Sequence, residues 1–514
     1  MTATPPDPQT VPVQRSKKAM AALLMGGALA GKMLGFVREV IMAQVVGVAL
    51  VADGFRSAIT IILMPLAFLQ NESVPAILVP MMKEAQERGD GPQRLARLSI
   101  ALTLVGVLLM LLMFLIAGVF VDWMVAGFSE EGRYLTLHLV YIMALSMPAS
   151  VLINCLASAE VAMGRTRLTN LRAATLNVGI IIGLGLLVLT SYNYILGWAF
   201  TAAFNILAVW GVYRLRAEGN LSVSGVTALQ VLETGREFLF RLRPFLLLPG
   251  AEQANIWLER LLASRVVTGA VASLDYARTL TDSALLLLSQ PIGLAILADG
   301  NKNDEREDIQ KIARPLLAAG VPFAAFVYAF SEDIVRLVFQ RGVFGEHGVM
   351  LTSQALSGVA IGMWASTVGW VLLRLLNRSN RNTKAAIILM SAYGANIAMN
   401  LTTQSLWSGS GIEVFLLGLG EATRSIVLLV GVALVLKCSG VLIQLLMIAL
   451  IPAGCLVLAE WQLLQHMAPS FERLVLGGML WVVSTLCAAW LLCPDLLRLV
   501  LTKVVGTLSR GKIK

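Results

Sequence analysis

The sequence predicts an all-α polytopic membrane protein with 14 transmembrane helices. Of its 514 residues, 57% are hydrophobic and only 14% are charged, and the mean hydropathy is +0.78. A soluble globular protein carries roughly 25% charged residues. Apolar stretches of about 20 residues, the length that crosses a bilayer as a helix, follow one another along the whole chain. This composition excludes an ordinary soluble domain.

The predicted spans include two that are longer than a simple crossing. The second contains Pro65 and then the polar run QNESVP at 70–75, which predicts a break in the helix. The eighth contains Pro291 and is also expected to bend. The 14 spans cover residues 19–47, 52–82, 98–121, 135–160, 170–190, 193–213, 239–264, 270–298, 310–330, 350–376, 384–404, 413–436, 440–463 and 474–494.

Lysine and arginine residues are distributed unequally between the two sides of the predicted bundle. With the N-terminus inside, 29 of the 40 fall in cytoplasmic loops and tails or at the cytoplasmic ends of spans, five lie on the opposite side, and six are embedded in spans. Cytoplasmic loops are enriched in these residues, so the split predicts that both termini are cytoplasmic. It also explains the net charge of +9 without a nucleic-acid partner.

Other features exclude several classes of function. Residues 1–18 are expected to form a disordered cytoplasmic tail, and residues 495–514 a basic one. No Walker A pattern occurs, which argues against ATP hydrolysis by this chain. The five cysteines and three histidines have no metal-ligand spacing, and no catalytic triad is evident. We therefore expect a transporter without metal or cofactor rather than an enzyme.

Charged residues inside the spans indicate a functional cavity. Lys32 and Arg38 lie six residues apart in the first span, so both can face one side of a helix within two turns. Arg56, Arg260 and Arg278 fall in the second, seventh and eighth spans. An isolated charge at bilayer depth is costly, and arginine binds phosphate oxygens with two parallel hydrogen bonds. These five residues predict a basic, water-filled cavity that binds a polyanion.

Internal ion pairing is the alternative interpretation of the same residues. Carboxylates occur in the same spans and would neutralise the cations; they are Glu39, Asp53, Glu252, Glu259, Asp275 and Asp282. Glu421 and Arg424 are three residues apart and are expected to pair within one helix. Glu160 has no neighbouring cation in sequence, which leaves an ion-binding role or headgroup contact open.

Three pieces of the chain resemble the MurJ/MviN family of lipid II flippases. They are GKMLGFVREVIMAQVVG (31–47) followed by VADGF (51–55), VRLVFQRGVF (335–344) and LLRLLNRSNRNTKAAI (372–387). The resemblance covers about residues 20–440, and 14 helices are typical of the family.

The resemblance implies the fold of the multidrug/oligosaccharidyl-lipid/polysaccharide exporters. Two pseudo-symmetric six-helix lobes, 19–214 and 239–436, would surround a central cavity and be joined by a cytoplasmic linker, 215–238. Residues 437–494 contain hardly any charge and would form a groove for an undecaprenyl tail. The cargo would be an undecaprenyl-pyrophosphate-linked saccharide, moved from the inner to the outer leaflet of the bacterial cytoplasmic membrane by alternating access. A coupling ion (Na⁺ or H⁺) and the membrane potential are both open as driving forces.

The family's functional positions can be placed on this sequence. Its basic positions in the first helix fall on Lys32 and Arg38, an aspartate on Asp53, and an arginine on or beside Arg278. Lys32 stands where the family usually has arginine, and LAFLQ (66–70) replaces a usual arginine pair. These departures leave lipid II and an exopolysaccharide repeat unit open as cargo. A cation-coupled drug antiporter on the same fold is the alternative class, and it would favour an acidic cavity.

Overall fold

The computed structural model describes residues 17–70, 73–298, 305–379 and 381–495. These residues form helices and turns, and no strand occurs among them. The first half of the chain contains α1 (Lys17–Val46), α2 (Leu50–Gln70), α3 (Ser73–Arg88), α4 (Gly91–Met124), α5 (Glu130–Ala144), α6 (Met147–Ala162), α7 (Arg167–Thr190), α8 (Ile195–Ala217) and α9 (Ala228–Leu242). The second half contains the 3₁₀ turn η1 (Arg243–Phe245), α10 (Leu247–Val266), α11 (Ala270–Ala298), α12 (Glu305–Ala329), α13 (Ser331–Phe339), α14 (Glu346–Arg378), α15 (Asn382–Trp407), α16 (Glu413–Val435), α17 (Ser439–His466) and α18 (Phe471–Leu492).

The all-α membrane architecture predicted from composition is confirmed. Within the described part of the chain, ten helices are long and apolar enough to cross a membrane. The pair α5 and α6, bent by 47°, adds an eleventh span if it is counted as one. α10 is not among them because Glu252, Glu259 and Arg260 interrupt its apolar residues. The number 14 stays a prediction.

The predicted break in the second span is confirmed. α2 ends at Gln70 and α3 begins at Ser73. Pro65 lies inside α2 and does not end it.

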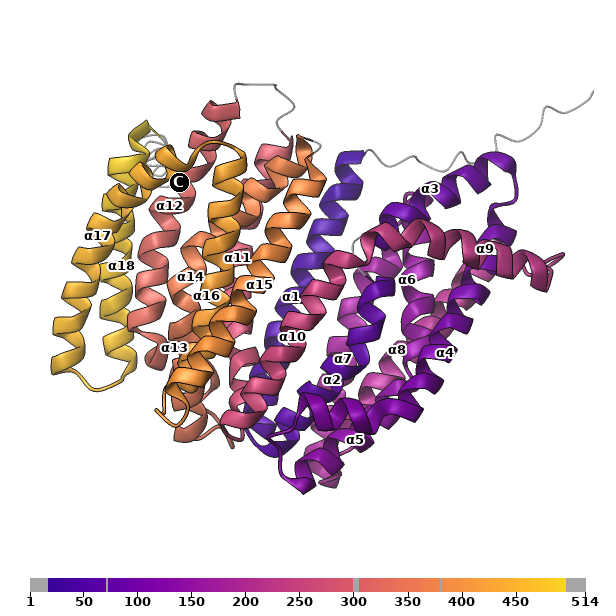
Figure 1. The fold of residues 1–514 in the computed structure, drawn as a ribbon, viewed down its shortest axis with the longest axis horizontal. Helices are drawn as coiled ribbons and strands as arrows, with labels where there is room; N and C mark the ends of the chain where they lie inside the picture. The colour runs from indigo at the N-terminus through magenta and orange to yellow at the C-terminus, as the bar shows by residue number, and fades with distance from the viewer. Residues whose placement is uncertain (1–16, 71–72, 299–304, 380, 496–514) are drawn as a thin grey trace, which may run out of the picture.

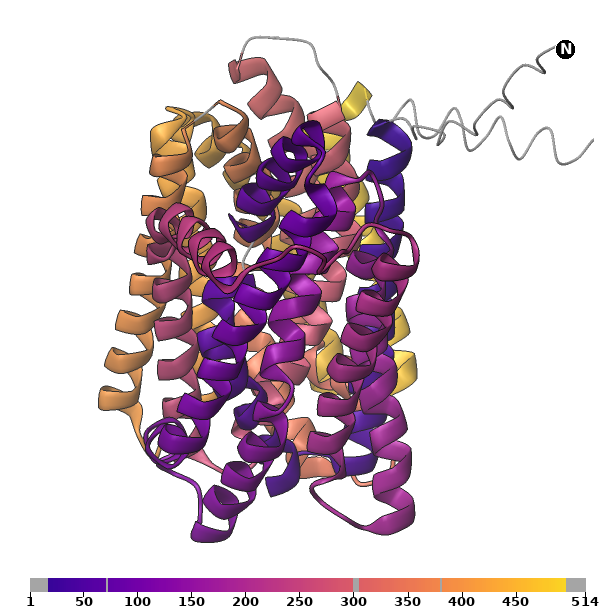
Figure 2. The ribbon, with the colours of Figure 1, turned by 90° about the vertical axis from the view of Figure 1, so that its right-hand side faces the viewer.

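The helices fall into two packed groups and an outer pair (Figures 1 and 2). In the first group α1 packs on α7, α2 on α5, and α4 on α6. In the second group α14 packs on α16 and α11, and α15 packs on α16 and α10. α17 and α18 pack on α12 and lie at the far edge of the molecule in yellow (Figure 1). α2 contacts α10 and α11, and α1 contacts α11, so these helices join the two groups. The exact lobe boundaries stay a prediction.

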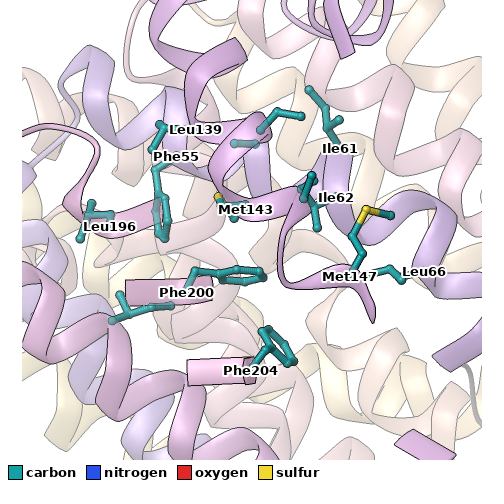
Figure 3. Close-up of a cluster of buried hydrophobic side chains, with 14 of the residues drawn as sticks. Phe55, Ile61, Ile62, Leu66, Leu139, Met143, Met147, Leu196, Phe200 and Phe204 are labelled. Carbon is teal, nitrogen blue, oxygen red and sulfur yellow. The ribbon is translucent and has the colours of Figure 1, made fainter. Parts of the chain in front are cut away.

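A tightly packed apolar cluster fixes α2 in the first group (Figure 3). Phe55, Ile61 and Ile62 of α2 are at most 1% exposed. They lie among large side chains from α5, α6 and α8, which are Leu139, Met143, Met147, Leu196, Phe200 and Phe204. This packing holds the polar residues of α2, including Asp53 and Arg56, at fixed positions in the bundle.

The region predicted as a linker contains a helix that the sequence analysis did not anticipate. α9 begins with a capping box at Thr227 and Gln230, and its buried residues Val231, Thr234 and Phe238 face the bundle. It packs on α4 and runs across the long helices (Figure 1). Because η1 follows, the next long helix starts at Leu247, later than the predicted residue 239.

Candidate functional site

A cavity of about 490 Å³ lies among α1, α10, α11, α14, α15 and α16. Its lining carries charges of both signs. The cations are Lys32, Arg278, Arg374 and Arg424, and the carboxylates are Glu252, Asp282 and Glu421. Neutral polar groups come from Asn255, Thr281, Ser366, Tyr393 and Ser425. A cavity therefore exists within the bundle, but its lining is mixed in charge rather than simply basic.

The cavity extends toward one end of the bundle. On α14 its lining runs from Val359 to Arg374, which at about 1.5 Å per residue is about 22 Å along the helix. Arg374 lies one turn before α14 ends at Arg378. The cavity therefore reaches from the middle of the membrane-crossing region to the end of the bundle that carries Arg378.

Two of the six predicted site residues line this cavity. Lys32 is exposed to it and has no ion-pair partner among the residues that the structure describes. Arg278 also lines it, but its guanidinium contacts Glu259 and lies 2.6 Å from Glu421. Lys32 and Arg278 therefore meet at one cavity from α1 and α11, and they differ in how far their charge is neutralised.

Three other predicted residues form a buried chain of ion pairs beside the cavity. Glu39 contacts both Arg38 and Arg56. Arg56 Nη1 lies 3.2 Å from Asp275 Oδ2, and Arg260 Nη2 lies 2.7 Å from Asp275 Oδ1. The chain thus connects α1 and α2 to α10 and α11. Ion pairing, the alternative considered for the embedded cations, is what the structure shows for Arg38, Arg56 and Arg260.

Arg38 also contacts a polar group outside this set of ion pairs. Its Nη1 donates a hydrogen bond of 2.9 Å to Asn177 Oδ1 of α7, and its side chain is 22% exposed. Asn177 in turn donates to the backbone oxygen of Gly31, one residue before Lys32. Arg38 is not among the residues that line the cavity.

Asp53, the sixth predicted residue, caps a helix of the other group. It is fully buried, and its two carboxylate oxygens accept hydrogen bonds from the backbone N–H groups of Gly269 (2.6 Å) and Ala272 (2.8 Å). Gly269 directly precedes α11 and Ala272 lies in its first turn, where unpaired donors and the helix dipole favour a negative charge. Asp53 therefore joins α2 to α11.

Backbone contacts close the bundle on the side away from Arg378. The Val343 N–H donates to Gln44 O at 3.1 Å, and the Tyr276 hydroxyl donates to Gly47 O at 2.9 Å. Gly47 has φ of +62°, a conformation that costs glycine little, and lies against Val343. We call these four residues, together with Asp53 and Gly269, the seam.

Two further predictions concern Glu421 and Glu160. Glu421 and Arg424 pair within α16 at 2.5 Å, as predicted. Glu160 is paired with Arg167 at 2.8 Å and accepts the N–H of Leu168, so its partner lies on the following helix. No group of three or more His, Cys, Asp or Glu side chains in the described ranges could hold a metal ion.

The sequence analysis missed several cavity residues, of which Arg374 and Tyr393 are the most informative. Arg374 was counted with the loop cations because it lies close to the end of its span. Its spacing of four residues from Trp370, which also lines the cavity, was the available signal. Tyr393 gave no such signal because it is uncharged and lies within an apolar span.

Comparison with known proteins identifies the family. The model of the family described as lipid II flippase MurJ matches residues 42–470. The chain belongs to this family. Its members are flippases, so the protein is a multi-pass inner-membrane transporter and not an enzyme, and the resemblance seen in three sequence pieces is confirmed.

Individual relatives are distant in sequence. The chain is 26% identical over 377 residues to a probable lipid II flippase MurJ of Rhizobium tropici, covering 69% of each protein. It is 22% identical over 349 residues to the probable lipid II flippase MurJ of Aquifex aeolicus, covering 66% of this chain and 68% of the relative.

Two solved structures share the fold. A lipid II flippase MurJ in an inward closed conformation superposes with a TM-score of 0.78 at 16% identity, over 92% of this chain and 99% of that one. An inward-facing multidrug resistance transporter of the MATE family gives a TM-score of 0.59 at 11% identity, over 81% of this chain and 98% of that one. The predicted exporter fold is therefore confirmed.

Proposed function

We propose that this protein moves lipid II from the inner to the outer leaflet of the cytoplasmic membrane. The observation that carries the proposal is the cavity that Lys32 and Arg278 share inside the membrane-crossing bundle of a MurJ-family chain. The pyrophosphate of such a cargo is strongly hydrated, and its hydration must be replaced when it leaves water. Fixed cations in a confined site can replace it through charge-assisted hydrogen bonds.

The six predicted residues would divide into two roles. Lys32 and Arg278 would contact the pyrophosphate, and Arg38, six residues or about 1.7 turns along α1 from Lys32, would take part when α1 moves. Asp53 would hold the two helix groups together at the seam, and Arg56 and Arg260 would do so through their ion pairs with Asp275.

Transport would proceed by alternating access. With both termini cytoplasmic, the Arg378 end of the cavity faces the cytoplasm and the seam faces the periplasm. Cargo would bind from the cytoplasm, and opening of the seam would then release it outward. A Na⁺ or H⁺ gradient or the membrane potential would drive the cycle. The undecaprenyl tail would run along α17 and α18, outside the cavity.

A second cargo, an exopolysaccharide repeat unit on the same lipid, is favoured by one local feature. The end of α2 supplies no cation: Leu66 and Leu69 are buried, and Gln70 donates a hydrogen bond of 2.6 Å to Ser150. A drug antiporter is less well supported, because Glu259 and Glu421 are engaged by Arg278 rather than free to bind a cationic drug.

Flipping in proteoliposomes tests the function and separates the cargoes. Vesicles would contain either fluorescent lipid II or a fluorescent exopolysaccharide repeat unit, and an impermeant reductant would quench only the outer leaflet. We expect fast exchange of lipid II by the unmodified protein and little exchange by Lys32→Gln. If the protein exchanges only the repeat unit, that repeat unit replaces lipid II as the proposed cargo. Exchange of neither lipid, at any imposed gradient, would reject the proposed function.

A further inference from the structure

We propose that Arg374 of α14 is a second phosphate-binding residue, which together with Lys32 of α1 forms a two-cation receptor for a sugar-linked pyrophosphate. The inference deepens the proposed function and rests on it. It assigns a role to a residue that lies outside the six predicted for the site.

The surroundings of Arg374 direct its charge toward the cavity. Its neighbours along α14 are buried: Leu372 and Leu376 are 0% exposed, and Leu373 is 3% exposed. α14 is therefore enclosed by protein at this level, and Arg374, which is partly exposed, lines the cavity. A cation enclosed in a membrane-crossing bundle is stable when it faces water or an anion, and the cavity provides that environment for Arg374.

The ion pairs around the cavity leave two cations available. Arg278 contacts Glu259 and Glu421, and Arg424 lies 2.5 Å from Glu421, so carboxylates already compensate both. Neither Lys32 nor Arg374 has an ion pair within the described parts of the chain. A pyrophosphate diester carries two negative charges, and Lys32 and Arg374 add cationic groups without an ion pair to the paired Arg278 in a cavity that Glu252 and Asp282 also line.

Asp282 of α11 modulates this receptor. It lines the same cavity and lies close enough to Lys32 to interact with it electrostatically, although not within ion-pair distance. A carboxylate beside Lys32 opposes the binding of an anion. Removal of the Asp282 charge should therefore tighten pyrophosphate binding, a direction that a loss of folding cannot imitate.

Trp370 indicates why the ligand carries a sugar. It precedes Arg374 by four residues, so both side chains project from the same face of α14. Trp370 lines the cavity and is 40% exposed. An exposed indole next to a phosphate-binding cation provides a flat apolar surface for the ring attached to that phosphate. The ligand class is therefore a lipid pyrophosphate with a hexose or amino sugar beside the phosphate.

Binding to short-chain probes tests the receptor in the purified full-length protein. The probes are farnesyl pyrophosphate and farnesol, and the variants are Lys32→Gln, Arg374→Gln, Arg374→Lys and Asp282→Asn. We expect each Gln variant to bind farnesyl pyrophosphate about tenfold more weakly, and Arg374→Lys to lose less than that. Asp282→Asn should bind it more tightly, and none of the variants should change farnesol binding. Arg378→Gln, one turn away and exposed outside the cavity, is the matched control and should behave as the parent.

The outcomes separate this inference from the proposed function. Weakened binding in Lys32→Gln with parental binding in Arg374→Gln would overturn the role of Arg374 and leave the cavity proposal standing. Parental binding in both variants, or no binding of farnesyl pyrophosphate by the parent, would overturn the cavity as a phosphate site altogether. Equal weakening by Arg374→Gln and Arg378→Gln would reduce Arg374 to a general surface charge and reject the receptor.

Discussion

Arg56 of α2 and Asp275 of α11 form an ion pair, 3.2 Å between Nη1 and Oδ2, that connects the first helix group to the second. The Arg56 side chain is 6% exposed and also contacts Glu39 of α1. Asp275 also binds Arg260 of α10. Four helices therefore share one buried set of charges, and the two groups cannot separate on this side without exchanging these partners for water or cargo.

Removing one member of this set should destabilise the protein strongly. Arg56→Ala leaves Glu39 and Asp275 buried with less compensation, so we expect the free energy of unfolding to fall by about 3–5 kcal/mol. Arg336→Ala is the control because its partner Glu346 is 69% exposed, and exposed pairs contribute less than about 1 kcal/mol. Chemical denaturation in detergent measures the free energy of unfolding of both variants. Equal losses in Arg56→Ala and Arg336→Ala would contradict the stabilising role of the buried ion pairs.

Asp53 should stabilise the fold through its hydrogen bonds as well as through its charge. Asp53→Ala leaves the N–H groups of Gly269 and Ala272 without their acceptor, which should cost about 2 kcal/mol or more. Asp53→Asn keeps one acceptor oxygen and should lose less. Glu131→Ala, an exposed residue in the first turn of α5, should change little. Thermal melts of the three variants measure whether the loss of stability is largest in Asp53→Ala, smaller in Asp53→Asn and smallest in Glu131→Ala. Parental stability in Asp53→Ala would disprove the helix-capping role of Asp53.

Arg38 should be needed for transport beyond its pairing with Glu39. We expect Arg38→Lys to retain part of the flipping rate, because the positive charge remains and only the bidentate hydrogen bonding of the guanidinium is lost. Arg38→Ala should insert and fold but lose most of the rate. If Arg38 only neutralised Glu39, the double variant Arg38→Ala/Glu39→Gln would recover activity. The proteoliposome assay measures the flipping rates of the three variants. Recovery of the parental rate in the double variant would reject a role of Arg38 in cargo binding.

The charge distribution predicts where the chain ends lie. A reporter fused after residue 514 should report a cytoplasmic location, and one inserted in the loop 408–412 between α15 and α16 should report the periplasm. The loop insertion controls for reporter failure because it must give the opposite signal. A periplasmic signal from the C-terminal fusion would overturn the prediction that both termini are cytoplasmic.

Much of the fold could be predicted because bilayer-spanning helices require long apolar runs. The break after Gln70 could be predicted too, since QNESVP is too polar to continue an apolar helix. α9 was not predicted because it is short and amphipathic, and its stabilisation comes from packing on α4, a tertiary contact. α12 likewise begins among charged residues at Glu305, and its first turns are stabilised by the burial of Ile309 and Ile312.

The sequence predicted which charged residues lie within the helices, but not which of them form ion pairs with one another. Sequence placed Arg56, Arg260 and Arg278 within predicted spans, and the structure places them in α2, α10 and α11. Their partners come from other helices: Arg260 pairs with Asp275 rather than with its neighbour Glu259, which binds Arg278. Such choices depend on helix rotation and packing, which a single sequence does not specify. Arg374 was assigned to a loop because the positive-inside rule does not distinguish a loop cation from a cavity cation near a helix end.

Restraining the seam tests alternating access most directly. Gln44 of α1 and Val343, which precedes α14, are joined by a backbone hydrogen bond of 3.1 Å, so cysteines at both positions would lie within reach of a short reducible thiol crosslinker. The unmodified protein with its five native cysteines and each single variant serve as controls. The account predicts that crosslinked Gln44→Cys/Val343→Cys exposes no lipid II in the outer leaflet and that reduction restores the parental rate. Flipping at the parental rate while the crosslink is intact would contradict it.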